Sequence, residues 1–151
     1  MTRVDFYVLP PGDERQRLVF ACRLSEKAYR QNLRVYLRAG DEATARQLDQ
    51  LLWTFRQGSF VPHALLEESE AAETPPVLIG IKPVAPDATD LIVNLAPELP
   101  EEYLRHPRVA ELIGHDESSR IAGRAHFRHY KNQGLEPETH TLATWPASGE
   151  N

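Results

Sequence analysis

The sequence contains a single cysteine, Cys22, and this scarcity excludes two kinds of protein. One cysteine forms neither an intramolecular disulfide nor a zinc site built from several thiolates. Such usage suits a reducing compartment, and we expect a cytoplasmic protein. Cys22 falls on the apolar side of a predicted helix, so we expect it to be a small buried hydrophobic residue.

Long apolar runs and glycine-rich motifs are also missing. No segment approaches the roughly 20 apolar residues that cross a bilayer, and Asp5 stands where a secretory signal would continue its apolar region. The eight glycines form neither a GxGxxG motif nor a P-loop, and no GxSxG elbow is present. We therefore expect no membrane contact, no cofactor, no metal and no catalytic activity.

Positive charge is in the minority, because 17 Lys and Arg face 22 Asp and Glu and give a formal net charge of −5. This balance disfavours a protein that coats duplex nucleic acid with a broad basic surface, although it leaves room for a local basic patch. The 151 residues, of which 41% are hydrophobic, are enough for one domain with a core of its own.

Apolar periodicity divides the chain into alternating strands and helices. Apolar, β-branched and aromatic runs predict strands at residues 4–9, 34–37, 77–81, 90–95 and 109–113. Helical spacing predicts helices at 13–33, 42–55 and 116–133, with Asp41 and Gly134 as caps. This order is typical of a three-layer α/β domain with a largely parallel sheet flanked by helices. We expect a single domain at residues 1–142 and a flexible tail at 143–151.

The last predicted helix carries a row of cations. Arg120, Arg124, Arg128 and Lys131 follow helical spacing and so share one face, with Phe127 beside them. Residues 118–134 contain four cations and no acid, which leaves a net charge of −9 for the rest of the chain. The row is either a solvated basic face near a helix C-terminus or an anion-binding strip. Such a strip would fit an acidic peptide with an apolar end, or a nucleic-acid backbone.

A second informative segment combines Trp53 with the loop that follows its helix. Trp53 lies off the apolar stripe of the predicted helix, and Phe60 and Val61 stand on the loop. These residues form an exposed apolar patch of the kind that marks a partner surface, or else the loop folds inward and closes the core.

The histidines give weaker signals. His126 and His129 lie three residues apart on the last helix, a spacing that can hold a metal, but no carboxylate shares their turn and a solvated helix face is the better interpretation. His63 follows a proline and has no second catalytic group tied to it. A small-molecule enzyme that uses the crevice at the strand ends is therefore disfavoured.

These two segments, together with others, resemble the chi subunit family of bacterial DNA polymerase III over about residues 3–142. The resemblance is carried by the opening Val-Asp-Phe-Tyr-Val-Leu, by Leu48-Asp49-Gln50-Leu51-Leu52-Trp53 followed by Ser59-Phe60-Val61-Pro62-His63, by Asp90-Leu91-Ile92-Val93-Asn94-Leu95, and by the basic helix that closes at Gly134. The Trp and the Phe-Val-Pro-His loop at this spacing are specific.

The resemblance implies a Rossmann-like fold and a non-catalytic adapter of DNA replication. One surface would bind the acidic C-terminal tail of single-stranded DNA-binding protein (SSB), and a second would bind the psi subunit and, through it, the clamp loader. The implied tail-binding residues are Ile113, Arg120, Arg124, Phe127, Arg128 and Lys131, and the implied psi-binding residues are Trp53, Phe60, Val61 and Pro62. DNA would be reached indirectly through SSB. The alternative is direct binding of single-stranded nucleic acid by the basic helix.

Overall fold

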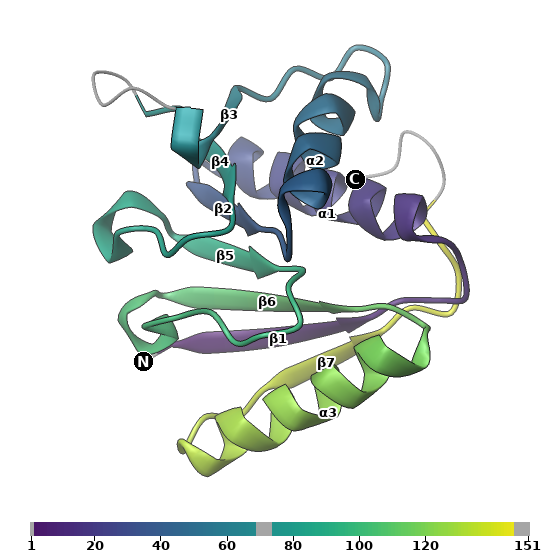
Figure 1. Cartoon of the computed structure of the whole chain (residues 1–151), viewed down its shortest axis with the longest axis vertical. Coiled ribbons are helices and arrows are strands. Elements are labelled where there is room, and N and C mark those ends of the chain that lie inside the picture. The colour runs from purple at the N-terminus through teal and green to yellow at the C-terminus, as the bar shows by residue number, and fades with distance from the viewer. Residues whose placement is uncertain (1, 69–73, 147–151) are drawn as a thin grey trace.

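One parallel sheet organises the molecule in the computed structural model, which describes residues 2–68 and 74–146. Within these residues the sheet has seven strands, in the order β3-β4-β2-β5-β6-β1-β7 (Figure 1). Every strand pair is parallel. The strands are β1 (Arg3–Val8), β2 (Val35–Arg38), β3 (His63–Leu65), β4 (Val77–Gly80), β5 (Leu91–Asn94), β6 (Arg108–Ile113) and β7 (Glu138–Thr141).

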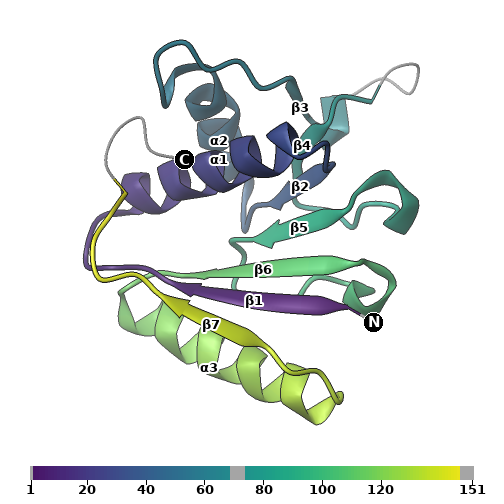
Figure 2. The ribbon, with the colours of Figure 1, turned by 180° about the vertical axis from the view of Figure 1, so that it is seen from behind.

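Helices cover both faces of this sheet. The helices are α1 (Glu14–Arg30), α2 (Glu42–Thr54) and α3 (Glu117–Asn132), with short 3-10 turns at Leu66–Glu68, Pro86–Ala88 and Tyr103–Arg105. α1 and α2 pack together over the β2, β4 and β5 side, whereas α3 lies beside β1, β6 and β7 on the other face (Figures 1 and 2). The predicted three-layer α/β fold with a parallel sheet is confirmed.

The alternation of side chains along the strands separates two cores. Val35, Leu37 and Val93 face α1 and α2, whereas Phe6 and Val109 face α3. Cys22 on α1 is fully buried, as expected, and burial raises the pKa of its thiol to about 12.

Aspartates start all three helices, since each N-cap carboxylate accepts a hydrogen bond from a backbone N–H of the first turn. Asp13 accepts from Gln16 N, Asp41 from Thr44 N and Asp116 from Ser119 N. The expected cap at Asp41 is confirmed. After α3, Gly134 adopts a φ of 83°, the left-handed conformation that glycine allows at a helix end.

Two strands do not appear in the sequence prediction. β3 has three residues and directly follows Pro62, and it joins the sheet by pairing with β4. β7 is an edge strand of polar residues, Glu-Thr-His-Thr, that pairs with β1 alone among the described strands. Neither segment has an apolar run, because one is short and the other is largely exposed, so periodicity gave no signal.

The end of the chain was predicted to be a flexible tail from residue 143, and residues 147–151 of that tail lie outside the described residues. Trp145 packs against the core, and its indole Nε1 donates a 3.0 Å hydrogen bond to the Pro11 carbonyl. The described part of the chain contains no helix that is long and apolar enough to cross a bilayer.

Candidate partner-binding surfaces

The exposed face of α3 carries the predicted row of cations. Arg120, Arg124, Arg128 and Lys131 are all exposed, and in the described part of the chain no carboxylate lies within ion-pair distance of any of them. Ile121, which the sequence analysis did not single out, is 53% exposed on the same side of the helix. We call these four cations with Ile121 and Phe127 the α3 surface. Its guanidinium groups are available to an external anion.

Close contact with the sheet fixes the position of α3. A Cβ at Gly123 would stand only 2.8 Å from Cδ1 of Ile113, so glycine is what lets the helix approach β6. Phe127 is 36% exposed and meets the buried ring of Phe6 edge-on, with centroids 5.4 Å apart. Ile113, an expected tail-binding residue, is 8% exposed and supports α3 from beneath.

A buried polar network joins α3 to the sheet. Glu111 on β6 is 2% exposed. Its carboxylate accepts hydrogen bonds from Tyr130 Oη at 2.6 Å and from Asn94 Nδ2 at 3.1 Å, and it lies 3.1 Å from Nδ1 of His126. Arg38 in turn donates to Asn94 Oδ1 at 2.9 Å. Because a buried carboxylate requires such partners, the network holds the helix in one rotation about its axis.

His126 is a buried member of this network, and the expectation of a solvated face is wrong for it. Its Nε2 lies 2.9 Å from the Pro97 carbonyl while Nδ1 faces Glu111, so both ring nitrogens meet acceptors. Burial lowers the pKa of His126, but the hydrogen bond and charge of Glu111, helped by the Pro97 carbonyl, outweigh it and raise the pKa. Its helix neighbour His129 bonds Tyr103 Oη at 2.8 Å instead, so the two rings do not share a site.

A cavity of about 450 Å³ opens at the carboxyl ends of β1, β5 and β6. It is the crevice where α/β proteins commonly bind ligands. The N-terminus of α3 at its rim is already occupied by the chain itself, because Asp116 accepts hydrogen bonds from Ser118 and from both the backbone and hydroxyl of Ser119. These bonds lower the pKa of Asp116 to about 2. The crevice thus offers no open helix N-terminus to a phosphate, and Phe127 is not among its lining residues.

A second exposed surface lies at the end of α2. Trp53 is 53% and Phe60 65% exposed, and their ring centroids are 6.0 Å apart. Pro62 is half-buried beside them. Val61, which the sequence analysis placed on this patch, points inward instead and is 1% exposed in the main core. Both alternatives from the sequence analysis are therefore realised: Val61 closes the core, whereas Phe60 on the loop and Trp53 on α2 face solvent.

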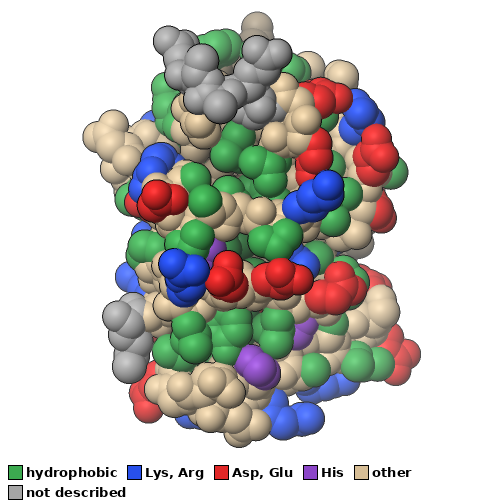
Figure 3. Space-filling view, turned by 60° about the vertical axis from the view of Figure 1, so that its left-hand side comes forward, with side chains coloured by type: hydrophobic (Ala, Val, Ile, Leu, Met, Phe, Trp, Pro, Cys, Tyr) green, Lys and Arg blue, Asp and Glu red, His purple; other side chains and the backbone are tan. Residues whose placement is uncertain are grey.

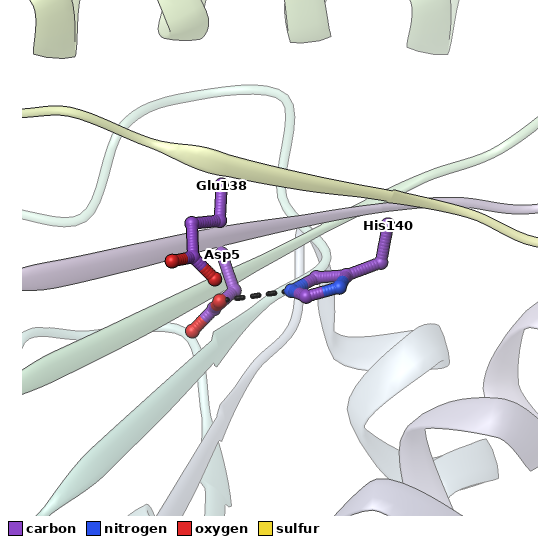
Figure 4. Close-up of side chains that lie close together, drawn as sticks. All are labelled: Asp5, Glu138 and His140. Carbon is purple, nitrogen blue, oxygen red and sulfur yellow. Dashed lines mark hydrogen bonds and ion pairs between the residues drawn. The ribbon is translucent and has the colours of Figure 1, made fainter.

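Asp5, Glu138 and His140 meet on neighbouring strands β1 and β7 (Figure 4). Their potential ligand atoms lie within 4.8 Å of one another, a spacing that a metal ion could use. However, Asp5 is 2% exposed and already pairs with Arg3 at 3.2 Å and Arg108 at 3.9 Å, and it accepts from His140 Nε2 at 3.0 Å. The cluster is an internal ion-pair network in which the carboxylate charge is already compensated.

Charge is distributed unevenly over the surface. In Figure 3, acidic side chains form a band across the middle of the visible face, and basic ones lie along its lower edge, at the level of α3. Because α3 carries cations without paired acids, the negative net charge of the molecule does not cancel its local field. The fold and its surfaces thus define a parallel α/β protein whose described residues form a basic exposed face on α3 and an apolar exposed face at the end of α2.

Comparison with known proteins assigns the family. A family profile described as "DNA polymerase III chi subunit, HolC" matches residues 1–138. The "DNA polymerase III subunit chi" of Pseudomonas aeruginosa is 45% identical over 142 residues, which cover 94% of this chain and 98% of that relative. The Escherichia coli protein of the same name is 24% identical over 124 residues, 82% of each chain. The chain belongs to the DNA polymerase III chi subunit family, as its motifs indicated.

Solved structures resemble this chain in fold alone. T4 UvsW superposes with a TM-score of 0.68 at 7% sequence identity, over 93% of this chain and 41% of that one. The C-terminal domain of the DEAD-box protein Dbp5 superposes with a TM-score of 0.59 at 15% identity, over 94% of this chain and 92% of that domain.

Proposed function

We propose that this chi family member is a non-catalytic adapter that binds the acidic C-terminal tail of SSB through the α3 surface. The observation that carries the proposal is the row of four exposed cations without described carboxylate partners. Four aligned cations repel one another in the absence of an anion, and an acidic peptide removes that repulsion. The guanidinium groups of Arg120, Arg124 and Arg128 suit bidentate pairing with carboxylates.

The apolar part of such a tail would contact Phe127, whose ring is partly exposed, and Ile121 on the opposite flank of the arginine row. Ile113 acts from beneath by holding α3 on β6, and Lys131 adds an outer charge. The buried Glu111–His126 pair fixes the helix that presents these groups.

We propose that the second surface, formed by Trp53, Phe60 and Pro62, binds the psi subunit and links the chain to the clamp loader. Large exposed aromatic side chains in contact with each other are typical of interface hot spots. Val61 contributes by packing inward and thereby fixing the loop. The supporting observation is the exposure of Trp53 near the C-terminal end of α2 and of Phe60 on the loop that follows it.

The α3 assignment is tested by titrating the full chain with a fluorescent peptide of the last residues of SSB. Replacing Arg124 with Ala removes a charge-assisted hydrogen bond and should weaken binding by about 1–3 kcal/mol, roughly 5- to 150-fold. Arg15→Ala is the matched control, since Arg15 is an exposed arginine on α1 with no described partner. Amidation of the peptide's terminal carboxylate should weaken binding as well, and added salt should reduce it. Wild-type affinity in the Arg124 variant would refute the assignment.

Direct binding of single-stranded nucleic acid by α3 is the competing hypothesis. Among the described residues, Phe127 is the aromatic side chain exposed within the cation row, whereas stacking platforms usually offer several. Filter binding of oligonucleotides without SSB separates the two. Tight retention of the oligonucleotide that grows with its length would favour the nucleic-acid hypothesis over the peptide hypothesis.

A further inference from the structure

The sheet has an open edge next to the α3 surface. β7 is the outermost strand, it pairs with β1 alone among the described strands, and α3 runs alongside it in both views (Figures 1 and 2). Directly after β7, the Leu142 N–H donates to the Val8 carbonyl at 2.9 Å. Because successive residues of a strand turn their backbone groups to opposite sides, the N–H and C=O groups of Thr139 and Thr141 point away from β1. These groups are a template for one more strand.

The cations of α3 lie on the side of the helix that faces this edge. The contacts of α3 with the sheet pass from β6, which the His126 side chain meets, to β1, which Phe127 meets. The next helix positions in the same direction are Arg120, Lys131 and Arg124. Since β7 is the strand beyond β1, the helix turns these three cations toward β7.

Side chains at the open edge point to the same face of the sheet as α3. Thr139 is paired in register with Phe6, whose ring faces α3, and both Thr139 and Thr141 are exposed. A strand added to β7 would therefore present every second side chain to the cations. On the opposite face, the Glu138 carboxylate is balanced by Arg3 at 3.8 Å. An extended acidic peptide thus meets free main-chain groups and cations side by side.

Charge favours an acidic peptide at this edge over other occupants and other edges. β3, at the opposite edge of the sheet, has three residues and is followed directly by Glu67 and Glu68, which repel acidic side chains. A second copy of this chain, paired with the first through β7 about a two-fold axis, would bring the two rows of cations together. An acidic peptide instead neutralises the row that it lies against.

We propose that the acidic tail binds as an added strand at the open edge of β7, between this edge and the cations of α3. The identity of the partner rests on the proposed function, and the mode of binding goes beyond it. The backbone groups of Thr139 and Thr141 hold the extended tail, as in other complexes in which a peptide joins a sheet. Arg120, Arg124 and Lys131 pair with the carboxylates on the side that faces α3.

The first test removes one amide of the edge. Thr139→Pro deletes an N–H that faces the open edge and keeps the bonds to β1, so its circular dichroism spectrum should match that of the wild type. It should weaken binding of the fluorescent SSB tail peptide roughly three- to tenfold, the effect of losing one backbone hydrogen bond. Thr139→Val keeps the N–H and should bind as the wild type does. Wild-type affinity in Thr139→Pro, with weakened binding in Arg124→Ala, would overturn the added strand and leave the proposed function standing.

The second test follows the edge amides in the wild-type chain. With ¹⁵N-threonine labelling, saturating peptide should slow hydrogen exchange of the Thr139 and Thr141 amides by about tenfold or more. The Thr44 amide already donates to Asp41 at 2.7 Å, so its exchange rate should not change. Unchanged exchange at both edge threonines in the bound state would refute the added strand.

Two other outcomes also count against the proposal. If the wild-type chain is a dimer that Thr139→Pro converts to a monomer, the edge holds a second copy instead of the tail. If the peptide does not bind the wild-type chain at all, the proposed function and the added strand fall together.

Discussion

Replacing Glu111 with Gln should destabilise the fold strongly, because the residue compensates the charge of a buried histidine. The carboxylate is 2% exposed and interacts with Tyr130, Asn94 and His126 at 2.6 to 3.3 Å. Removing one partner of a buried pair typically costs about 3–5 kcal/mol. The amide keeps one acceptor oxygen, and His126 can release its proton, so we expect the lower end, about 3 kcal/mol.

The loss of unfolding free energy in Glu111→Gln should depend on pH in a definite direction. Glu111 raises the pKa of His126 above its ordinary value, so the pair's contribution is full below about pH 6.5 and is lost as the pH rises through the folded pKa. In Glu111→Gln the hydrogen bond and charge of Glu111 that raise this pKa are removed, and the hydrogen bond to the Pro97 carbonyl remains to oppose burial and the charge of Arg38. The difference in unfolding free energy between wild type and variant should therefore be largest near pH 6 and smaller near pH 9.

Urea unfolding followed by circular dichroism at these two pH values measures the effect. Glu101→Gln is the control, since it removes an exposed carboxylate that has no described partner and should change stability by less than about 0.5 kcal/mol. If Glu111→Gln costs less than about 1 kcal/mol at pH 6, or if its deficit grows with pH, then His126 is not held as an imidazolium and the account of how α3 is fixed is wrong.

Two further measurements check other parts of the structure. Asp116→Ala removes the N-cap of α3 and should cost about 0.5–2 kcal/mol of unfolding free energy. Because the pKa of Asp116 is lowered to about 2 in the folded protein, the cap's contribution to stability is present above the unfolded pKa and is lost as the pH falls through about 2. A contribution of Asp116 that is already lost completely at pH 5 would contradict this assignment. Replacing Trp53 and Phe60 together with Ala should weaken psi binding by at least about 2 kcal/mol. The unfolding free energy should stay within about 1 kcal/mol of wild type, since both rings are largely exposed. A large loss of stability with unchanged binding would show that the rings stabilise the fold instead.

The role of single residues in these surfaces was only partly accessible from the sequence. The row from Arg120 to Lys131 could be found because helical spacing puts residues four apart on one face whatever the rest of the fold does. Val61 and Phe60 are adjacent and both apolar, yet one is buried and the other is exposed. Which of them faces the core depends on the path of the loop between α2 and β3, and no local pattern encodes that path.

By itself the sequence determined the class of the fold, the three helices with the cap at Asp41, and the cations on one helical face, since all of these follow from local propensity and periodicity. Tertiary structure alone decided the strand order, because parallel neighbours are brought together by crossovers rather than by adjacency in the chain. It also decided the fate of the histidines. His63 and His126 are polar residues in sequence, and their side chains are buried in the fold because carbonyl and carboxylate oxygens face both nitrogens of each ring.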